Sequence, residues 1–353
     1  MASDDGSRPR RAPPIPGRRE LLAAALAAAL VAVSGAAAGR DAAALSPAPA
    51  LKPCCGLVAE VYATGLKRPT ALAFGPDRLL YATQETGEVV AVGPGSTRPR
   101  VLARGFETPL GLTWVGSTLY VSAQGYVSRL SVRDGRVVSR RKLVTKLPFD
   151  RHQQDTIVLG PDGRLYLGSG STCDVCKEKD SRSGAIVSFR QDGSDLRVVA
   201  RGLRNPFGLV FDGPTLYVSD NARDDLGEEE PAETIVRFRS GADYGWPRCW
   251  ASWRLRKPQG SCRGVTAPIA YLEPHSSANT LALWAGTVVV AEWGQYLSER
   301  WGRKLVQVNV RNGRSSTLVD GFEHPLGLAV EPRAGGLLAG DWGRGVIYRI
   351  RKR

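Results

Sequence analysis

Short apolar runs recur along the chain in a fixed order, with polar turns between them. Each copy begins near a proline or its equivalent, continues as an apolar run, passes a Gly- or Asp-containing turn, and ends in a second and a third apolar run. Runs of this length, rich in β-branched and aromatic residues and bounded by Gly, Pro and Asp, are typical of β-strands. Six copies occur: PTALAFGPDRLLYAT from Pro69, PLGLTWVGSTLYVS from Pro109, DTIVLGPDGRLYLGS from Asp155, PFGLVFDGPTLYVS from Pro206, ANTLALWAGTVVVAE from Ala278 and PLGLAVEPRAGGLLAG from Pro325.

The six copies predict an all-β repeat fold. Each copy supplies three strands, and the segment before the next copy, such as RVLARG at 100–105, supplies a fourth. Four-stranded antiparallel blades around an axis form a β-propeller. The regular return of one module favours such an array over an open series of β-sandwiches. We therefore predict a six-bladed β-propeller over residues 57–353.

The first 38 residues have the pattern of an export signal. Residues 1–20 are polar and basic, and Leu21–Ala38 is an uncharged run with small residues at Ala36 and Ala38 for cleavage. Arg18 and Arg19 resemble the pair of a twin-arginine signal. The run also reaches the length of a membrane anchor. We expect a periplasmic, cell-surface or secreted protein, with residues 1–38 as signal peptide or uncleaved membrane tether and residues 39–56 as a linker.

The charge of the chain does not indicate a nucleic-acid binder. The formal net charge of +14 comes mostly from scattered arginines, which are typical of a solvated basic surface. The sequence contains no helix-turn-helix, zinc-finger or aromatic-interleaved basic stripe. We therefore expect no nucleic-acid partner.

The six cysteines are expected to form disulfides, because the protein is expected to be exported. Cys249 with Cys262 is the first pair expected. Cys173 and Cys176 form a CxxC, which suits either half of a zinc site or a small-loop disulfide. Cys54 and Cys55 lack a lipobox before them, so no lipid anchor is predicted.

The topology of a propeller brings particular loops together. Within a blade, the loop before the first strand, here called the leading loop, opens on the same face as the loop between the second and third strands. Each of the three histidines, His152, His275 and His324, lies in a leading loop. Any one polar residue there is more typical of a hydrogen-bonded loop, but together they predict a site. The residues just before the copies are Lys67 and Arg68, Glu107 and Thr108, His152 and Gln153, Arg204 and Asn205, Ser276 and Ser277, and Glu323 and His324.

The residue types at these positions suit proton transfer and anion stabilisation. His152 is the candidate general base, because histidine accepts a proton near neutral pH. Arg204 offers a fixed fork of donors for a developing oxyanion, and Asn205 adds amide hydrogen bonds. The stretch DNARDDLGEEE at 220–230, with Asp220 and Asn221 at its start, gathers oxygen ligands that suit Ca²⁺. A solvated acidic loop that balances a basic protein explains the same stretch equally well.

Several ordered motifs resemble the soluble quinoprotein glucose/sorbosone dehydrogenases. They are HQQDTIVLGPDGRLYLGSGSTCDVC, GLRNPFGLVFDGPTLYVSDNARDDLG, GADYGWPRCW and LEPHSSANTLAL, and the likeness runs from about residue 58 to the end. The resemblance implies a six-bladed propeller that binds pyrroloquinoline quinone (PQQ) with Ca²⁺ and oxidises sugar hydroxyls or sugar aldehydes. Electrons would then pass to an acceptor such as a cytochrome or a quinone.

The same resemblance implies roles for individual residues. His152 would take the proton, and Arg204 with Asn205 would contact the quinone. The backbone carbonyls of Ala222 and Arg223 would hold the calcium ion, which a carbonyl does whatever its side chain. The further cofactor contacts expected are Trp293 by stacking, Lys304 by charge, and His324, which stands where the family usually presents an arginine.

Two other function classes remain open from the sequence. One is a Ca²⁺-dependent lactonase or esterase, which needs metal-bound carboxylates on the axis. It ranks lower because the acids gather in one loop instead of several leading loops. The other is a non-catalytic ligand-binding propeller that has lost the cofactor.

Overall fold

The computed structural model describes residues 45–295 and 300–353. The predicted leader at residues 1–38 and the first residues of the predicted linker lie outside the described residues, so the domain boundaries stay predictions. The described residues form strands, turns and loops without a helix. Among them, accordingly, there is no helix long and apolar enough to cross a membrane.

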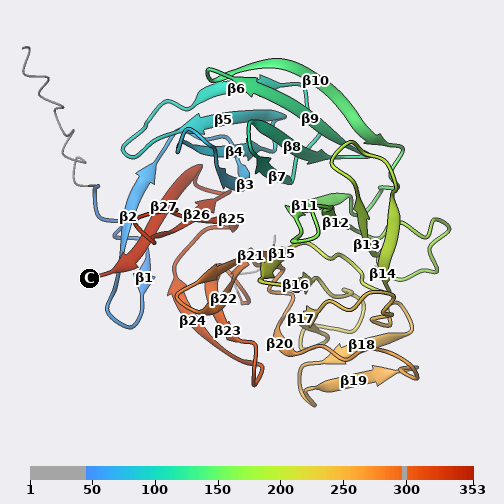
Figure 1. Cartoon of the computed structure of the whole chain (residues 1–353). Coiled ribbons are helices and arrows are strands. Elements are labelled where there is room, and N and C mark those ends of the chain that lie inside the picture. Colours follow the sequence, from blue (N-terminus) through green and yellow to red (C-terminus); the bar gives the residue numbers. More distant parts are fainter. Residues whose placement is uncertain (1–44, 296–299) are drawn as a thin grey trace, which may run out of the picture. The chain divides into compact units, whose positions relative to one another are not determined.

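Six inner strands surround the central axis, and each begins one of the blades (Figure 1). Each of them lies beside the inner strands of the neighbouring blades, which closes the ring. Five of these strands start within two residues of the first residue of the predicted copy. The fourth, β15, starts three residues after Pro206, where the fourth copy begins. The inner strands are β3 (Pro69–Phe74), β7 (Gly111–Val115), β11 (Gln154–Leu159), β15 (Leu209–Asp212), β21 (Ala278–Trp284) and β25 (Pro325–Val330).

The remaining strands complete six antiparallel sheets, so the predicted six-bladed β-propeller is confirmed. Blades one to three follow the chain in order. Their outer strands are β4 (Leu80–Gln84), β5 (Glu88–Val92) and β6 (Arg100–Arg104) in the first, β8 (Thr118–Ala123), β9 (Tyr126–Arg133) and β10 (Arg136–Thr145) in the second, and β12 (Leu165–Ser169), β13 (Ala185–Phe189) and β14 (Arg197–Arg201) in the third.

Blades four to six depart from this simple order in three places. A hairpin absent from the predicted module is inserted before the last strand of blade four, strand β1 adds to the edge of blade five, and strand β2 completes blade six. The strands are β16 (Thr215–Asp220), β17 (Ala232–Arg237), the hairpin β18 (Cys249–Ser252) and β19 (Lys257–Gly260), and β20 (Ala270–Pro274) in the fourth; β22 (Thr287–Glu292), β23 (Lys304–Asn309), β24 (Arg314–Asp320) and β1 (Lys52–Pro53) in the fifth; and β26 (Leu337–Asp341), β27 (Val346–Lys352) and β2 (Leu57–Ala63) in the sixth.

The start of the described chain closes the propeller. Strand β2 pairs antiparallel with β27, so the two ends of the ring share one sheet. Residues just before β2, which fall in the predicted linker, also pack on the propeller. Ala48 and Leu51 are buried in the core between blades five and six, and β1 pairs with β24.

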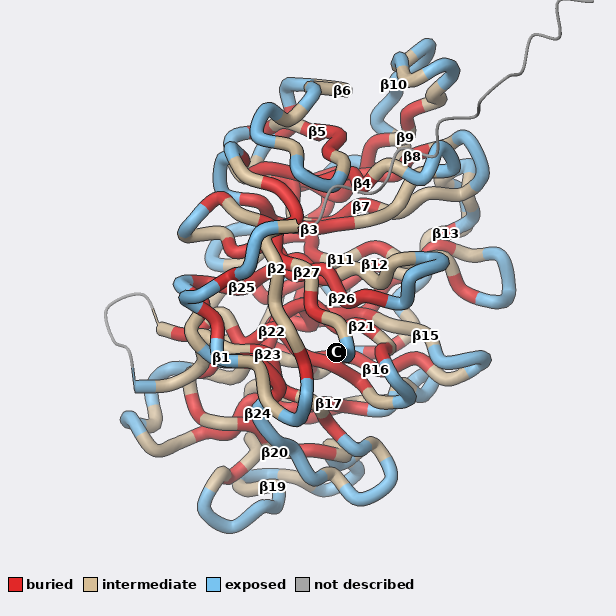
Figure 2. Tube along the Cα trace, turned by 90° about the vertical axis from the view of Figure 1, so that its left-hand side faces the viewer, coloured by how far each residue is buried: buried red, intermediate tan, exposed pale blue. Residues whose placement is uncertain are grey.

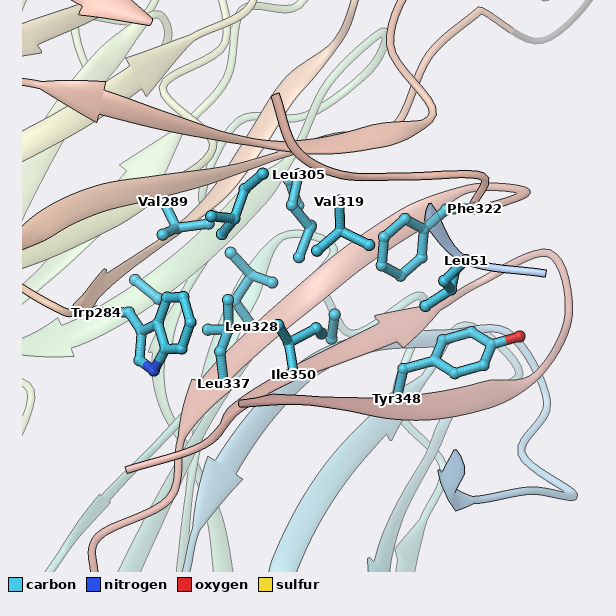
Figure 3. Close-up of a cluster of buried hydrophobic side chains, with 14 of the residues drawn as sticks. Leu51, Trp284, Val289, Leu305, Val319, Phe322, Leu328, Leu337, Tyr348 and Ile350 are labelled. Atoms are coloured by element: carbon cyan, nitrogen blue, oxygen red, sulfur yellow. The ribbon is translucent and has the colours of Figure 1, made fainter. Parts of the chain in front are cut away.

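Apolar side chains fill the spaces between neighbouring blades. In the described residues, six buried clusters lie one at each interface between two blades. Figure 3 shows the cluster between blades five and six, where Leu305 and Val319 of one blade face Leu337 and Ile350 of the next. Because a blade is covered on both faces, central strands such as β4 and β13 are buried at every position. Figure 2 shows exposure confined largely to the turns and outer edges.

All six cysteines are paired. Cys249 joins Cys262 across the hairpin, as expected, and Cys54 joins its neighbour Cys55. Cys173 joins Cys176, so of the two readings of this CxxC the small-loop disulfide holds and the zinc half-site does not. Cys173, Cys176 and Glu178 lie close enough to share a metal ion, but both sulfurs are used in the disulfide.

The packing between blades three and four predicts the effect of one substitution. A Cβ at Gly168, in β12, would overlap the backbone carbonyl oxygen of Pro206 in the next leading loop. We expect Gly168→Ala to lower the free energy of unfolding by about 1–3 kcal/mol, since over-packing forces the backbone to move. Gly93→Ala is the control, because its Cβ would meet only one side-chain atom at 4.0 Å. Chemical denaturation measures both, and equal midpoints for the two variants would contradict the packing.

Candidate functional site

One face of the propeller contains a cavity of about 720 Å³. Leading loops and loops between second and third strands line it, as the topology predicted. Six predicted site residues are among the lining residues: His152, Arg204, Asn205, Asn221, Ala222 and Trp293. Asp220, Arg223, Lys304 and His324 do not line it. Such a volume accommodates a cofactor or a sugar-sized ligand.

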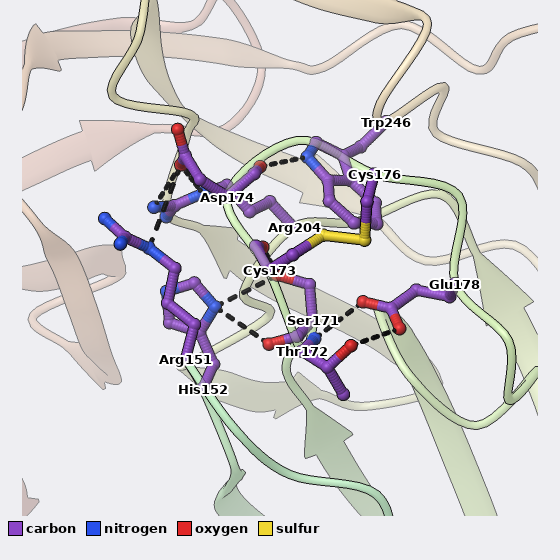
Figure 4. Close-up of a disulfide and its surroundings, with 10 residues drawn as sticks. All are labelled: Arg151, His152, Ser171, Thr172, Cys173, Asp174, Cys176, Glu178, Arg204 and Trp246. Atoms are coloured by element: carbon purple, nitrogen blue, oxygen red, sulfur yellow. Dashed lines mark hydrogen bonds and ion pairs between the residues drawn. A yellow bond between two sulfur atoms is a disulfide. The ribbon is translucent and has the colours of Figure 1, made fainter.

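Hydrogen bonds to Ser171 determine which nitrogen of His152 carries the proton. The Nδ1 atom lies 3.1 Å from the carbonyl oxygen of Ser171 and 3.0 Å from its hydroxyl oxygen (Figure 4). A carbonyl only accepts, so Nδ1 carries the hydrogen, and the Ser171 hydroxyl in turn donates to the Cys173 carbonyl at 2.7 Å. The Nε2 atom has no hydrogen-bond partner among the described residues and therefore keeps its lone pair, and His152 lines the cavity.

The surroundings keep His152 neutral. Burial, followed by the positive charge of Arg204, lowers the pKa of His152 to about 3. The imidazole therefore holds no second proton near neutral pH, and Nε2 is available to accept one. A general base needs this state before the reaction begins.

A single carboxylate joins three cationic side chains at the cavity. Asp224 accepts from Arg204 Nη2 at 2.7 Å and from Arg151 Nη2 at 2.7 Å, and lies 3.5 Å from Nδ1 of His275. Burial alone would raise the pKa of Asp224, but the hydrogen bond from His275 and the charges of Arg204 and Arg151 hold it below its ordinary value. The same hydrogen bond raises the pKa of His275 to about 9. Asp174 also lies against Arg204 and Arg151, so three cations face two carboxylates, which leaves one positive charge for an anionic ligand.

Arg204 is fixed from two sides. Its side chain is only 4% exposed, and Nε donates to Asp174 at 2.9 Å while Nη2 meets Asp224. Backbone contacts orient the same loop, because the Asp220 carboxylate accepts from the backbone N–H groups of Arg204 and Asn205. Asp220 therefore supports the loop without lining the cavity.

Asn205 and Asn221 lie at the floor of the cavity. Asn205 Nδ2 donates to Asn221 Oδ1 at 3.4 Å, and Asn221 Nδ2 donates to the carbonyl of Ala278 at 2.6 Å. The Oδ1 atom of Asn205 is buried and has no hydrogen-bond partner. A buried amide oxygen without a partner costs free energy, which a bound cation or donor would recover.

The other predicted residues make contacts elsewhere. Lys304 Nζ pairs with Glu273 at 2.6 Å, and Arg223 pairs with Asp225 and donates to the Pro247 carbonyl. His324 is buried and stacks on Trp293, with ring centroids 3.8 Å apart. His324 therefore supports the Trp293 ring, which lines the cavity.

The acidic loop is occupied by protein partners. Asp225 pairs with Arg223, Glu228 and Glu229 pair with Arg300, and Glu230 accepts from Ser252. These carboxylates are thus used within the protein, and the residues of the stretch that line the cavity are Asn221, Ala222 and Asp224.

Sequence reasoning did not assign roles to several lining residues. Asp155 and Glu233 place carboxylates at the cavity from β11 and β17, and Arg151, Asp224 and His275 form the charge cluster. The sequence indicated Asp155 as the first residue of the third copy. It indicated His275 as a histidine in a leading loop. The position of Asp224 in the loop after β16 could have indicated a site residue. Its neighbour Asp225 lies in the same loop but pairs with Arg223, so the position alone does not distinguish the two.

A sequence profile of the glucose/sorbosone dehydrogenase family matches residues 117–316, more than half of the chain. The chain belongs to this family. The expected family resemblance is thereby confirmed, and the protein is a sugar oxidoreductase by family. Among curated proteins, none matches the sequence.

Solved structures of similar fold include several sugar-oxidising enzymes. A calcium structure of carbohydrate-active enzymes family AA12 from Trichoderma reesei has a TM-score of 0.77 and 17% identity, covering 89% of this chain and 100% of that chain. The PQQ domain of pyranose dehydrogenase from Coprinopsis cinerea has a TM-score of 0.75 and 17% identity, with 86% and 97% covered. A PQQ-bound aldose sugar dehydrogenase from Streptomyces coelicolor has a TM-score of 0.67 and 19% identity, with 85% and 100% covered. At these identities the likeness shows the shared fold.

The protonation states of the histidines can be tested before any cofactor is added. We expect His152 to stay neutral, with the hydrogen on Nδ1, from about pH 8 to about pH 5, whereas a solvated histidine titrates near 6.5. His275 should stay protonated until the pH rises through about 9. Nitrogen-15 NMR of the three histidines measures both. Titration of His152 near pH 6.5 would contradict the geometry.

Proposed function

We propose that this protein is an exported dehydrogenase that uses pyrroloquinoline quinone and Ca²⁺ to oxidise an aldose sugar or a sugar aldehyde. The single observation that supports this most is His152, a neutral base with Nε2 at the cavity, beside the cationic Arg204. Family membership supplies the substrate class, and the structural relatives that contain PQQ or calcium support the cofactors.

The residues present fit the proposed cofactor. Pyrroloquinoline quinone is planar and carries three carboxyl groups, and the cavity offers Trp293 for stacking and Arg151, Arg204 and His275 for charge. Lys304 and His324 do not line the cavity, so we assign the cationic contacts to Arg151, Arg204 and His275 instead. The carbonyl oxygen of Ala222 and the partnerless Oδ1 of Asn205 are the kind of oxygen ligands that Ca²⁺ prefers.

The roles of the chain's own residues follow from their contacts. Bound quinone supplies an acceptor for a hydride equivalent. His152 Nε2 would take the proton from the oxygen of the sugar hydroxyl as a hydride leaves the carbon that bears this hydroxyl. Ser171 holds the imidazole by Nδ1. Arg204, fixed by two carboxylates, stabilises negative charge that develops on an oxygen in the cavity.

We expect the quinone to bind tightly only when Ca²⁺ is present, which absorbance titration of the protein measures. In loaded protein, His152→Ala should lower kcat for dye-linked sugar oxidation by about 10²–10⁴-fold, since the general base is lost. Retained quinone binding by the variant serves as the control for folding. Full activity of His152→Ala would refute the assigned base. Absence of quinone binding despite Ca²⁺ loading would favour the non-catalytic binding propeller.

A second candidate function is the Ca²⁺-dependent lactonase. The structure removes one argument against it, because Asp155 and Glu233 line the cavity from two different strands and the acids are not confined to one loop. The Oδ2 atom of Asp155 is buried without a hydrogen-bond partner, and a bound Ca²⁺ ion would satisfy it.

Sugar-lactone hydrolysis by quinone-free, Ca²⁺-loaded protein separates the two candidates. A dehydrogenase should hydrolyse no lactone under these conditions. Hydrolysis that Asp155→Asn abolishes would establish the lactonase instead, because that change removes one carboxylate charge and keeps the side-chain volume.

Export and electron transfer complete the proposal. The predicted leader at residues 1–38 supports export, with the twin-arginine pair suited to a protein that leaves the cell already folded. Three disulfides are consistent with an oxidising compartment. We propose a cytochrome or a quinone as the acceptor, and a membrane tether where the leader is retained.

A further inference from the structure

One short loop contacts both residues to which the chemistry is assigned. The segment Ser171–Glu178, here called the disulfide loop, follows β12 and contains the Cys173–Cys176 bond (Figure 4). At its start, Ser171 binds Nδ1 of His152 through its carbonyl and hydroxyl oxygens. The Ser171 hydroxyl accepts from His152 because its own hydrogen is given to the carbonyl of Cys173, the first cysteine of the bond. Cys173 thus orients one of the two Ser171 oxygens that hold the hydrogen on Nδ1 of His152.

The residue between the two cysteines holds Arg204. The Asp174 carboxylate accepts from Arg204 Nε at 2.9 Å and also from the backbone N–H of Asp224. The carbonyl of Asp174 accepts from Trp246 Nε1 at 3.1 Å. Asp174 therefore connects Arg204 to two other loops of the same face.

Covalent and polar contacts hold the disulfide loop in place. It contains no helix or strand, and Val175 at its tip is 39% exposed, so apolar burial contributes little. The Glu178 carboxylate accepts from the backbone N–H and the hydroxyl of Thr172, at 2.6 and 2.7 Å, and the disulfide lies inside this bridge. Ordering a loop costs backbone entropy, and a covalent closure reduces this cost.

We propose that the disulfide loop is the positioning element of the site, and that the Cys173–Cys176 bond is required to hold the Nδ1–H tautomer of His152 and the direction of Arg204. The catalytic part of this inference rests on the proposed function, whereas the tautomer part concerns the protein alone. A dithiol would open the loop by transferring two electrons and two protons. The S–S bond breaks, two thiols form, and the dithiol becomes a disulfide.

The test compares two full-length variants that each lose one disulfide. Cys173→Ser/Cys176→Ser opens the loop, and Cys54→Ser/Cys55→Ser is the matched control, because that pair lies beside β1 and does not line the cavity. Without quinone, nitrogen-15 NMR should show His152 as a mixture of tautomers in the first variant and as Nδ1–H in the control. With quinone and Ca²⁺, the first variant should lose about tenfold or more in kcat while the sugar KM stays within about twofold, since misplacement acts on the chemical step.

An unchanged tautomer and unchanged kcat in Cys173→Ser/Cys176→Ser would overturn the proposal. If wild-type protein oxidises no sugar, the proposed function fails, and the NMR comparison still decides the tautomer part. If the double variant does not fold, Asp174→Asn keeps the disulfide and removes the charge that holds Arg204. This variant should lower kcat and leave the His152 tautomer as in the wild type, and a wild-type kcat would overturn the Arg204 part.

Discussion

The pairing of β2 with β27 is the constraint on which the rest of the structure depends. It joins the start of the described chain to its end within one blade, so six blades close into a ring instead of an open array. In a closed ring each blade packs against two neighbours, so one apolar cluster lies at each of the six blade interfaces. The same ring brings the leading loops to one face. The cavity is thus a consequence of topology before any side chain is considered.

Within the cavity, charge is arranged so that a neutral base lies beside fixed cations. Arg204 both lowers the pKa of His152 and pairs with Asp174 and Asp224, which keep the guanidinium in place. A positive charge near a histidine favours its neutral form, and the same charge favours anion binding. One arginine therefore prepares a base and an anion site together. The pairing with Asp174 compensates the burial of its charged side chain, which is almost fully buried.

The six blades could be predicted because burial on both faces of a blade demands apolar runs at regular spacing. The hairpin β18–β19 escaped prediction because it occurs once and therefore has no repeat to reveal it. His152, Arg204 and Asn205 were found from their positions in leading loops, where topology decides location. His324 lies in a leading loop and Lys304 at the end of the loop between β22 and β23, yet His324 stacks on Trp293 and Lys304 pairs with Glu273, so neither lines the cavity. Such partners lie about 30 residues away in sequence, so local pattern cannot identify them.

The central claim is that a neutral His152 presents Nε2 to a quinone held beside Arg204. A crystal structure of the protein with pyrroloquinoline quinone, Ca²⁺ and a sugar tests it most directly. We expect the quinone in the cavity, Ca²⁺ on the carbonyl of Ala222, and Nε2 of His152 within hydrogen-bond distance of the sugar hydroxyl that is oxidised. A quinone bound elsewhere, or a sugar hydroxyl out of reach of His152, would contradict it.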